Sequence, residues 1–138
     1  MQCPLCEAST DTVLWQDHRL RVVYVDEPDY VGYCRVIWQA HVAEMTDLDD
    51  ASRVHCMRAV YAVESLLRSL LKPDKINLAS LGNFVPHVHW HVIARFRDDA
   101  HFPQAIWGSR QREPVAPRVQ GATLLQQLRH GLAHQLLP

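Results

Sequence analysis

Three histidines alternate with apolar residues in the segment His87–Ile93, and this pattern constrains the fold more than any other part of the chain. Alternation with a period of two is typical of a β-strand that buries one face and exposes the other. We therefore expect the apolar residues to pack into the core and the imidazoles to stand in a row on the opposite face. The apolar set is Val88, Trp90 and Val92, and the row is His87, His89 and His91.

The histidine row has two functional interpretations, besides that of a strand whose outer face is merely polar. Imidazole has an ordinary pKa of about 6.5, so a neutral ring can attack phosphorus or a carbonyl carbon while its neighbours bind oxygen or protonate a leaving group. Alternatively, His-x-His can place two imidazoles on one zinc or iron ion. A metal enzyme of that kind normally adds a third ligand, and the residues Arg95 to Arg97 that follow include no carboxylate.

The composition excludes several classes of function. The chain has 138 residues, which is one domain of ordinary size, and a formal net charge of −1 with neutral histidines. This charge provides no basic field for a nucleic-acid polymer, and no apolar run approaches the ~20 residues that span a bilayer. Residues 1–6 lack the basic and apolar regions of a signal peptide, so we expect a cytoplasmic protein with no membrane partner and with reduced cysteines.

Alternating and helical patterns together predict an α+β fold with an antiparallel sheet. The long helix should follow Thr46 as its N-cap and present Val54, Met57 and Tyr61 among the residues of its apolar face. The chain has no βαβ alternation and no glycine-rich phosphate loop. The predicted strands are 18–26, 32–38, 75–81 and 87–96, the long helix is 47–71, and a smaller C-terminal helix is 121–137. The apolar positions of this last helix, at helical spacing, are Leu124, Leu125, Leu128, Leu132 and Leu136.

A second motif, Cys3-Pro4-Leu5-Cys6, is half of a zinc site. The same pair could equally be two exposed reduced thiols, whereas a redox pair would normally open a helix in a thioredoxin-like fold. Cys34 and Cys56 fall on a predicted strand and the long helix, where we expect them to be buried as small apolar side chains. The arginines near the triad, Arg35 and Arg95, are interpreted as solvated surface residues.

Residues 87–93 match the histidine-triad motif, His-φ-His-φ-His-φ-φ, in which φ is apolar. The segment Trp38–Leu48, which contains His41, and the block Asn77–Asn83 are similar to the segments that precede the triad in that family. Over roughly residues 3–107 the chain thus resembles the histidine triad (HIT) family. Residues 96–107 look like those of a bacterial subgroup that is often labelled diadenosine tetraphosphate hydrolase.

The resemblance implies a fold and a domain organisation. Members of the family have a five-stranded antiparallel sheet flanked by helices, and they usually pair into homodimers. On this basis residues 1–107 are expected to form a HIT-like domain that includes the Cys-x-x-Cys knuckle. Residues 108–138 would form a C-terminal extension with a short amphipathic helix.

The resemblance also implies a chemistry, namely hydrolysis or nucleotidyl transfer at the α-phosphate of a nucleoside phosphate, phosphoramidate or dinucleoside polyphosphate. By position in the motif, His89 would be the nucleophile that forms a nucleotidyl-histidine. His91 would assist at the phosphate oxygens, and His41 would support the catalytic site from the neighbouring segment. No cofactor is required for this reaction. The implied substrate-binding residues are Asp26, which would meet the ribose hydroxyls, and Asn77, Asn83 and His87.

Some bacterial members complete the cysteine knuckle with two histidines. The corresponding ligands here would be Cys3, Cys6, His41 and His87, around a possible structural zinc ion.

The chain also departs from the family pattern. Phe84 stands where a Ser or Thr often precedes the triad, and Gln39-Ala40 replaces the usual Pro-Lys. A nucleotide-binding regulatory module with little catalysis, or a metal-dependent enzyme that uses the histidine row, is therefore an alternative. A bound base would lie on apolar residues of the first two strands, such as Val23 or Val25.

Overall fold

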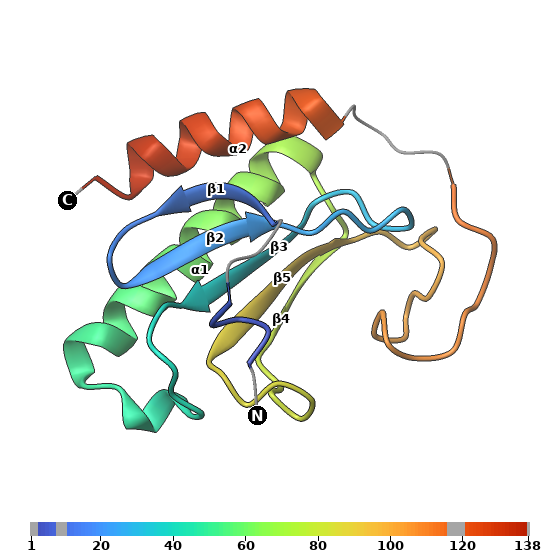
Figure 1. Cartoon of the computed structure of the whole chain (residues 1–138). Helices are drawn as coiled ribbons and strands as arrows, with labels where there is room; N and C mark the ends of the chain where they lie inside the picture. The colour runs from blue at the N-terminus through green and yellow to red at the C-terminus, as the bar shows by residue number, and fades with distance from the viewer. Residues whose placement is uncertain (1–2, 8–10, 116–120, 138) are drawn as a thin grey trace.

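The structure is a computed structural model that describes residues 3–7, 11–115 and 121–137. Five antiparallel strands form one sheet in the order β1-β2-β3-β5-β4. Helix α1 lies behind this sheet in Figure 1, and α2 runs along α1 and β1. This arrangement confirms the α+β fold with a five-stranded antiparallel sheet, one long helix and a C-terminal helix. The elements are β1 Thr12–Gln16, β2 Leu20–Tyr24, β3 Tyr33–Trp38, a 3₁₀ turn Met45–Asp47, α1 Asp50–Leu71, β4 Lys75–Ala79, β5 His89–Arg95 and α2 Gly121–Gln135.

The strand pair β2–β3 matches the pair predicted at 18–26 and 32–38, but β1 is an addition that the sequence patterns did not predict. The ladder between β1 and β2 is irregular between Val13 and Trp15. Because such a bulge breaks the strict alternation of inward and outward side chains, and only Leu14 of β1 is fully buried, the period-two signal is weak there.

The prediction of Thr46 as the N-cap of the long helix was wrong. The cap of α1 is Asp49, whose carboxylate accepts a hydrogen bond from the Ser52 N–H at 2.8 Å. Thr46 instead lies inside the 3₁₀ turn that precedes the helix. A short acidic side chain at the N-cap can accept a hydrogen bond from the backbone N–H three residues later, which has no partner within the helix. Asp49 is at that position because its backbone is still extended and the helix begins at the next residue.

The predicted apolar face of α1 was also partly wrong, because Val54 is 68% exposed and Tyr61 56% exposed. At about 100° per residue both lie on the side of the helix opposite the buried residues. The buried face of α1 consists of Cys56, Ala59, Val60, Ala62, Val63, Leu67 and Leu71. Cys34 and Cys56 are both buried, as expected.

Helix α2 belongs to the same core as the sheet. Leu124, Leu128 and Leu132 are fully buried and pack in one cluster with residues of α1 and β2. The expected apolar face of this helix is confirmed. Neither helix in the described part of the chain combines the length and the apolar character needed to cross a membrane.

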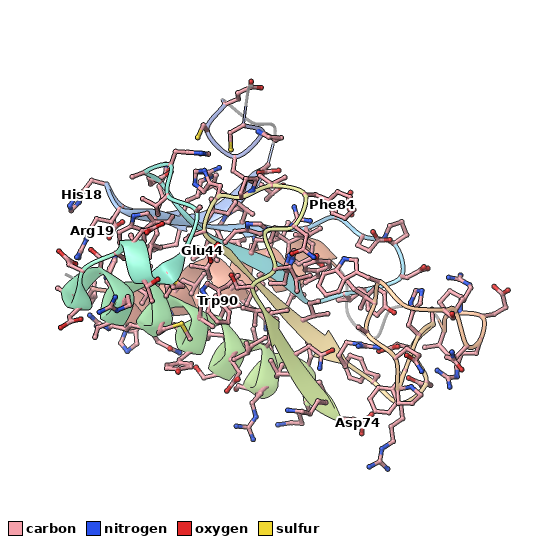
Figure 2. The ribbon with its side chains drawn as sticks, turned by 90° about the horizontal axis from the view of Figure 1, so that it is seen from below. His18, Arg19, Glu44, Asp74, Phe84 and Trp90 are labelled. Atoms are coloured by element: carbon pink, nitrogen blue, oxygen red, sulfur yellow. The ribbon has the colours of Figure 1, made fainter. Side chains whose placement is uncertain are left out.

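The apolar half of the triad segment faces the core, as the alternation predicts. Val88 and Val92 are buried, and Trp90 packs against the same cluster, on the side of the sheet where α1 lies (Figure 2). The opposite face of β5 is therefore the one that carries His89 and His91. In the ladder with β3, His91 lies opposite Arg35 and His89 lies opposite Ile37.

Candidate functional site

The structure divides the three triad histidines into two groups. Strand β5 begins at His89, so the prediction that His87 lies on the strand was wrong. Pro86 lacks a backbone donor, and the His87 N–H turns back to the Val85 carbonyl at 2.8 Å instead of continuing a ladder. The remaining pair, His89 and His91, has ring centroids 5.1 Å apart with the rings inclined by 76°.

The half-buried ring of His89 is held by a backbone carbonyl. Its Nδ1 lies 2.6 Å from the carbonyl oxygen of His87. A carbonyl can only accept, so Nδ1 must carry the proton and donate it. In the neutral ring the lone pair is then on Nε2, which makes that nitrogen the nucleophilic atom of the pair.

The His91 ring is buried and its surroundings favour the neutral form. Burial, followed by the positive charges of Arg35 and His89, lowers the pKa of His91 to about 4. Its Nδ1 lies 2.8 Å from the Tyr33 hydroxyl. Burial raises the pKa of Tyr33, so the hydroxyl stays protonated and can donate to Nδ1. The proton of His91 is then on Nε2, from which it can be donated to a ligand.

A second cluster gathers the cysteine knuckle and the other two histidines of interest. The ligand atoms of Cys3, Cys6, His41 and His87 all lie within 4.8 Å of one another. The Cys6 sulfur is 3.3 Å from Nδ1 of His41 and 3.4 Å from Nδ1 of His87, and the two Nδ1 atoms are 3.2 Å apart. Around tetrahedral zinc, with Zn–S of about 2.3 Å and Zn–N of about 2.05 Å, such donor atoms lie roughly 3.3–3.6 Å apart.

The orientation of His87 also suits metal binding. Its Nε2 lies 2.5 Å from the Trp38 carbonyl oxygen, so Nε2 donates and the lone pair is on Nδ1, toward the cluster. These four residues could therefore hold a metal ion. His41 lies with the cysteines, and its ring packs edge-on against His87 at 5.1 Å.

The other predicted substrate-binding residues lie in different surroundings. Asn77 is on β4, where its side-chain oxygen accepts a hydrogen bond from Arg95 at 2.7 Å. Asp26 is exposed in the turn after β2, and Asn83 is exposed in the loop between β4 and β5. Phe84, in the same loop, is fully exposed (Figure 2).

A cavity of about 210 Å³ opens beside the histidine pair, and sequence reasoning missed most of its walls. Tyr33 and Arg35 come from β3, and alternation in that strand could have placed them on the same face as His91. The interpretation of Arg35 as a solvated residue was wrong, because it is half-buried in this wall. Trp107 contacts His91 edge-on, with ring centroids 5.0 Å apart. The cavity is lined by Val25, Glu27, Asp29, Tyr30, Tyr33, Arg35, His101, Ile106 and Trp107.

Arg95 is not a solvated residue either, because it is 2% exposed and pairs with Asp99. Its Nε and Nη2 donate to the two Asp99 oxygens at 2.8 and 3.0 Å, and Nη2 also donates to the Gln104 carbonyl at 2.7 Å. Although burial alone would raise it, hydrogen bonds from Arg95 and from three backbone N–H groups lower the pKa of Asp99. This ion pair attaches the segment after β5, which carries His101 and Trp107, to the sheet.

Comparison with known proteins connects these features to one family. A family model described as the HIT domain matches residues 7–98. The curated relative "AP-4-A phosphorylase" of Mycobacterium tuberculosis is 26% identical over 85 residues, which cover 57% of this chain and 44% of the relative. The chain thus matches less than half the length of that relative.

Solved structures show the same fold. A histidine triad protein from Bradyrhizobium japonicum superposes with a TM-score of 0.71 at 28% identity, over 92% of this chain and 91% of that one. A Zn-bound histidine triad family protein from Mycobacterium smegmatis superposes with a TM-score of 0.62 at 20% identity, over 91% of this chain and 86% of that one.

Proposed function

Because this chain belongs to the HIT domain family, we propose that it is an enzyme that hydrolyses or transfers a nucleotidyl group at the α-phosphate of a nucleoside phosphate, phosphoramidate or dinucleoside polyphosphate. One observation carries the proposal: the His89–His91 pair has a free lone pair on one ring beside a neutral N–H donor on the other. The name of the phosphorylase relative supports a dinucleoside polyphosphate among the substrates.

In the proposed reaction Nε2 of His89 attacks the α-phosphorus. A P–N bond forms, the bond from phosphorus to the leaving group breaks, and the electron pair departs with that group. The attacking His89 ring becomes cationic, and the His87 carbonyl that accepts from Nδ1 stabilises that charge. Water then attacks the same phosphorus: a P–O bond forms, the P–N bond breaks with its electron pair returning to Nε2 of His89, and the water proton is released to solvent. In both steps Nε2–H of His91 donates to a phosphoryl oxygen.

The remaining substrate contacts follow from position. Asp26 is proposed to bind the ribose hydroxyls, and Asn83 to contact the phosphates or the leaving group. Asn77 is already bonded to Arg95, so we propose that it acts by supporting β4 and the 96–107 segment.

We further propose that Cys3, Cys6, His41 and His87 bind a structural zinc ion, which would tie the N-terminal segment to the sheet. The close spacing of their ligand atoms supports this, as does the Zn-bound state of the M. smegmatis protein. His41 and His87 then act as metal ligands, and His41 takes no direct part in the reaction. A homodimer, as the family resemblance implies, is the proposed assembly.

The test is turnover of an adenosine phosphoramidate, a guanosine phosphoramidate and diadenosine tetraphosphate, followed by chromatography of the released nucleotides. His89→Ala should abolish release, and His130→Ala, at an exposed position on α2, is the matched control. Acid-labile labelling of wild-type protein by a radiolabelled nucleotide, absent in His89→Ala, would identify the nucleotidyl-histidine. Equal rates in wild-type protein and His89→Ala would refute the mechanism.

The exposed Phe84 gives one specific reason to consider a second function, a nucleotide-binding module with little catalysis. An aromatic side chain supplies no proton for a leaving group at the position where a hydroxyl is common. Calorimetric binding of a mononucleotide without measurable turnover of any of the three substrates would favour that function over the enzyme.

A further inference from the structure

The cavity beside the histidine pair has walls that suit a flat heterocycle. It shares Tyr33 with the pair, since the Tyr33 hydroxyl contacts His91. Val25 and Ile106 provide apolar surface, and Trp107 provides an aromatic ring. Val25 is one of the two residues expected under a base, whereas Val23 is 1% exposed. Every nucleobase has a flat aromatic face that can stack on such walls. The apolar and aromatic walls alone therefore give no selectivity among the bases.

The polar groups of the cavity do choose. The guanidinium carbon of Arg35 lies 5.6 Å from the centre of the Tyr33 ring, which holds this planar donor group against the aromatic wall. Within the described residues its Nε is buried without a hydrogen-bond partner. Because Nε is closed off from the cavity, the terminal N–H groups of the Arg35 guanidinium are the ones left to meet a ligand, and a planar donor fork of this kind suits a ligand with acceptor atoms in its plane.

Two carboxylates face the same cavity, and they differ in how they are engaged. Asp29 is paired with Arg110 at 3.0 Å, whereas Glu27 lines the cavity with an exposed side chain. Burial raises the pKa of Tyr33. The positive charge of Arg35 lowers this pKa and the negative charge of Glu27 raises it, so both side chains act on the hydroxyl that contacts His91. Because carboxylates repel a phosphate, Glu27 and Asp29 favour a neutral group such as a nucleobase in this cavity.

We propose that this cavity binds the base of the nucleotide and selects guanine, with Arg35 and Glu27 as the specificity-determining residues. The inference rests on the proposed nucleotide-binding function. Guanine presents two acceptors, O6 and N7, to a guanidinium, and two donors, N1–H and the 2-amino group, to a carboxylate. On the same edge adenine has one acceptor, N7, and one donor, the 6-amino group. The 6-amino donor would face the N–H donors of an arginine, which is unfavourable. Cytosine offers one amino donor and covers less of the aromatic wall.

The experiment measures binding of GMP, IMP, AMP and CMP to the full-length metal-replete protein by isothermal titration calorimetry. One bidentate contact is worth roughly 1–3 kcal/mol of discrimination, so GMP should bind about 5- to 150-fold more tightly than AMP. IMP lacks the 2-amino group and should fall between them. The rates with guanosine and adenosine phosphoramidates should differ in the same direction.

Two variants assign the preference to its residues. Arg35→Leu should lower the GMP to AMP affinity ratio to the part that Glu27 contributes, and Glu27→Gln, which keeps only one acceptor oxygen, should narrow the difference between GMP and IMP. Arg68→Leu, at an exposed position on α1, is the matched control and should keep the wild-type ratio. Circular dichroism and thermal melting check that each variant is folded, and a ratio measured within one variant is independent of its active fraction.

The outcomes separate the two proposals. If AMP or CMP binds wild-type protein as tightly as GMP, guanine selection is refuted while the nucleotide-binding function stands. If the ratio survives in Arg35→Leu, the assignment to Arg35 is refuted. If none of the four nucleotides binds and no phosphoramidate is cleaved, the proposed function itself fails.

Discussion

Replacing Asp99 by Asn should destabilise the protein far more than the loss of an ordinary surface charge. Asp99 is 6% exposed and receives five hydrogen bonds, two from the Arg95 guanidinium and three from backbone N–H groups. Asn keeps one acceptor oxygen and turns an amide donor toward the guanidinium. Since this leaves the charge of Arg95 buried and unpaired, we expect a loss of about 3–5 kcal/mol in the free energy of unfolding.

Urea unfolding followed by tryptophan fluorescence measures this loss. The matched control is Asp50→Asn, which breaks the pair between Asp50 and Arg53 at a carboxylate that is 93% exposed. An exposed pair contributes about 1 kcal/mol or less, so the two losses should differ several-fold although each variant removes one carboxylate from one arginine.

The pH dependence provides an independent check on the sign. The pKa of Asp99 is lower in the folded protein than the ordinary value of about 3.9 in the unfolded chain. The stabilisation is therefore fully present above that ordinary value and is lost as the pH falls through the folded value. The difference between wild-type protein and Asp99→Asn should stay constant from about pH 7 to about pH 5 and shrink below about pH 4. A loss no larger than that of the control, or a difference that does not shrink in acid, would show that Asp99 does not form a buried, hydrogen-bonded ion pair with Arg95.

Three further outcomes are expected. The pKa of His91 is about 4 in the folded protein, whereas the ordinary value is about 6.5, so between these values the unfolded chain binds more protons than the folded one. Stability should therefore fall as the pH drops from about 6.5 to about 4, and it should fall less in His91→Gln. Gly32→Ala should cost roughly 2 kcal/mol or more in urea unfolding, since Gly32 has φ of 84° and an added Cβ would collide with Leu71; Gly121→Ala, with open space around it, is the control. Removal of metal by a chelator, or Cys6→Ser, should lower the zinc content measured by mass spectrometry from one per chain toward zero. Tm should fall by roughly 3–5 °C for each kcal/mol of stability lost, and an unchanged Tm would argue against a structural metal.

The elements that the sequence predicted well are those whose pattern is set by one buried face. Alternation placed Val88, Trp90 and Val92 toward the core, and helical spacing placed Leu124 and Leu128 in it. The pattern is reliable in these segments because the same core covers the whole length of each element. It fails at Val54 and Tyr61, which lie on the exposed side of α1 although they are apolar and spaced as if on one buried face. The polar residues Arg58, Ser65 and Arg68 share that side and mark it as the exposed one.

The site was less predictable, because its walls come from segments that meet only in the folded chain. Parity puts Arg95 on the same polar face as His91, and sequence alone cannot show that residues 96–107 fold back over that face and bury it. The same holds for Arg35, whose environment depends on Trp107, 72 positions along the chain from it. The metal cluster was expected only through resemblance to a family, since spacing by itself offers no reason to join Cys3 to His87.

His87 links the cysteine–histidine cluster to the His89–His91 pair, although its ring faces away from the proposed reaction. Its ring lies between the cysteine knuckle and the Trp38 carbonyl, and its own carbonyl accepts from Nδ1 of His89. The ring contacts therefore set the position of the carbonyl that determines which nitrogen of the proposed nucleophile carries the lone pair. A metal ion in the cluster would hold that carbonyl in place without approaching the reacting phosphorus. In the proposed reaction the first histidine of the motif thus supports catalysis through its backbone, while the other two act through their rings.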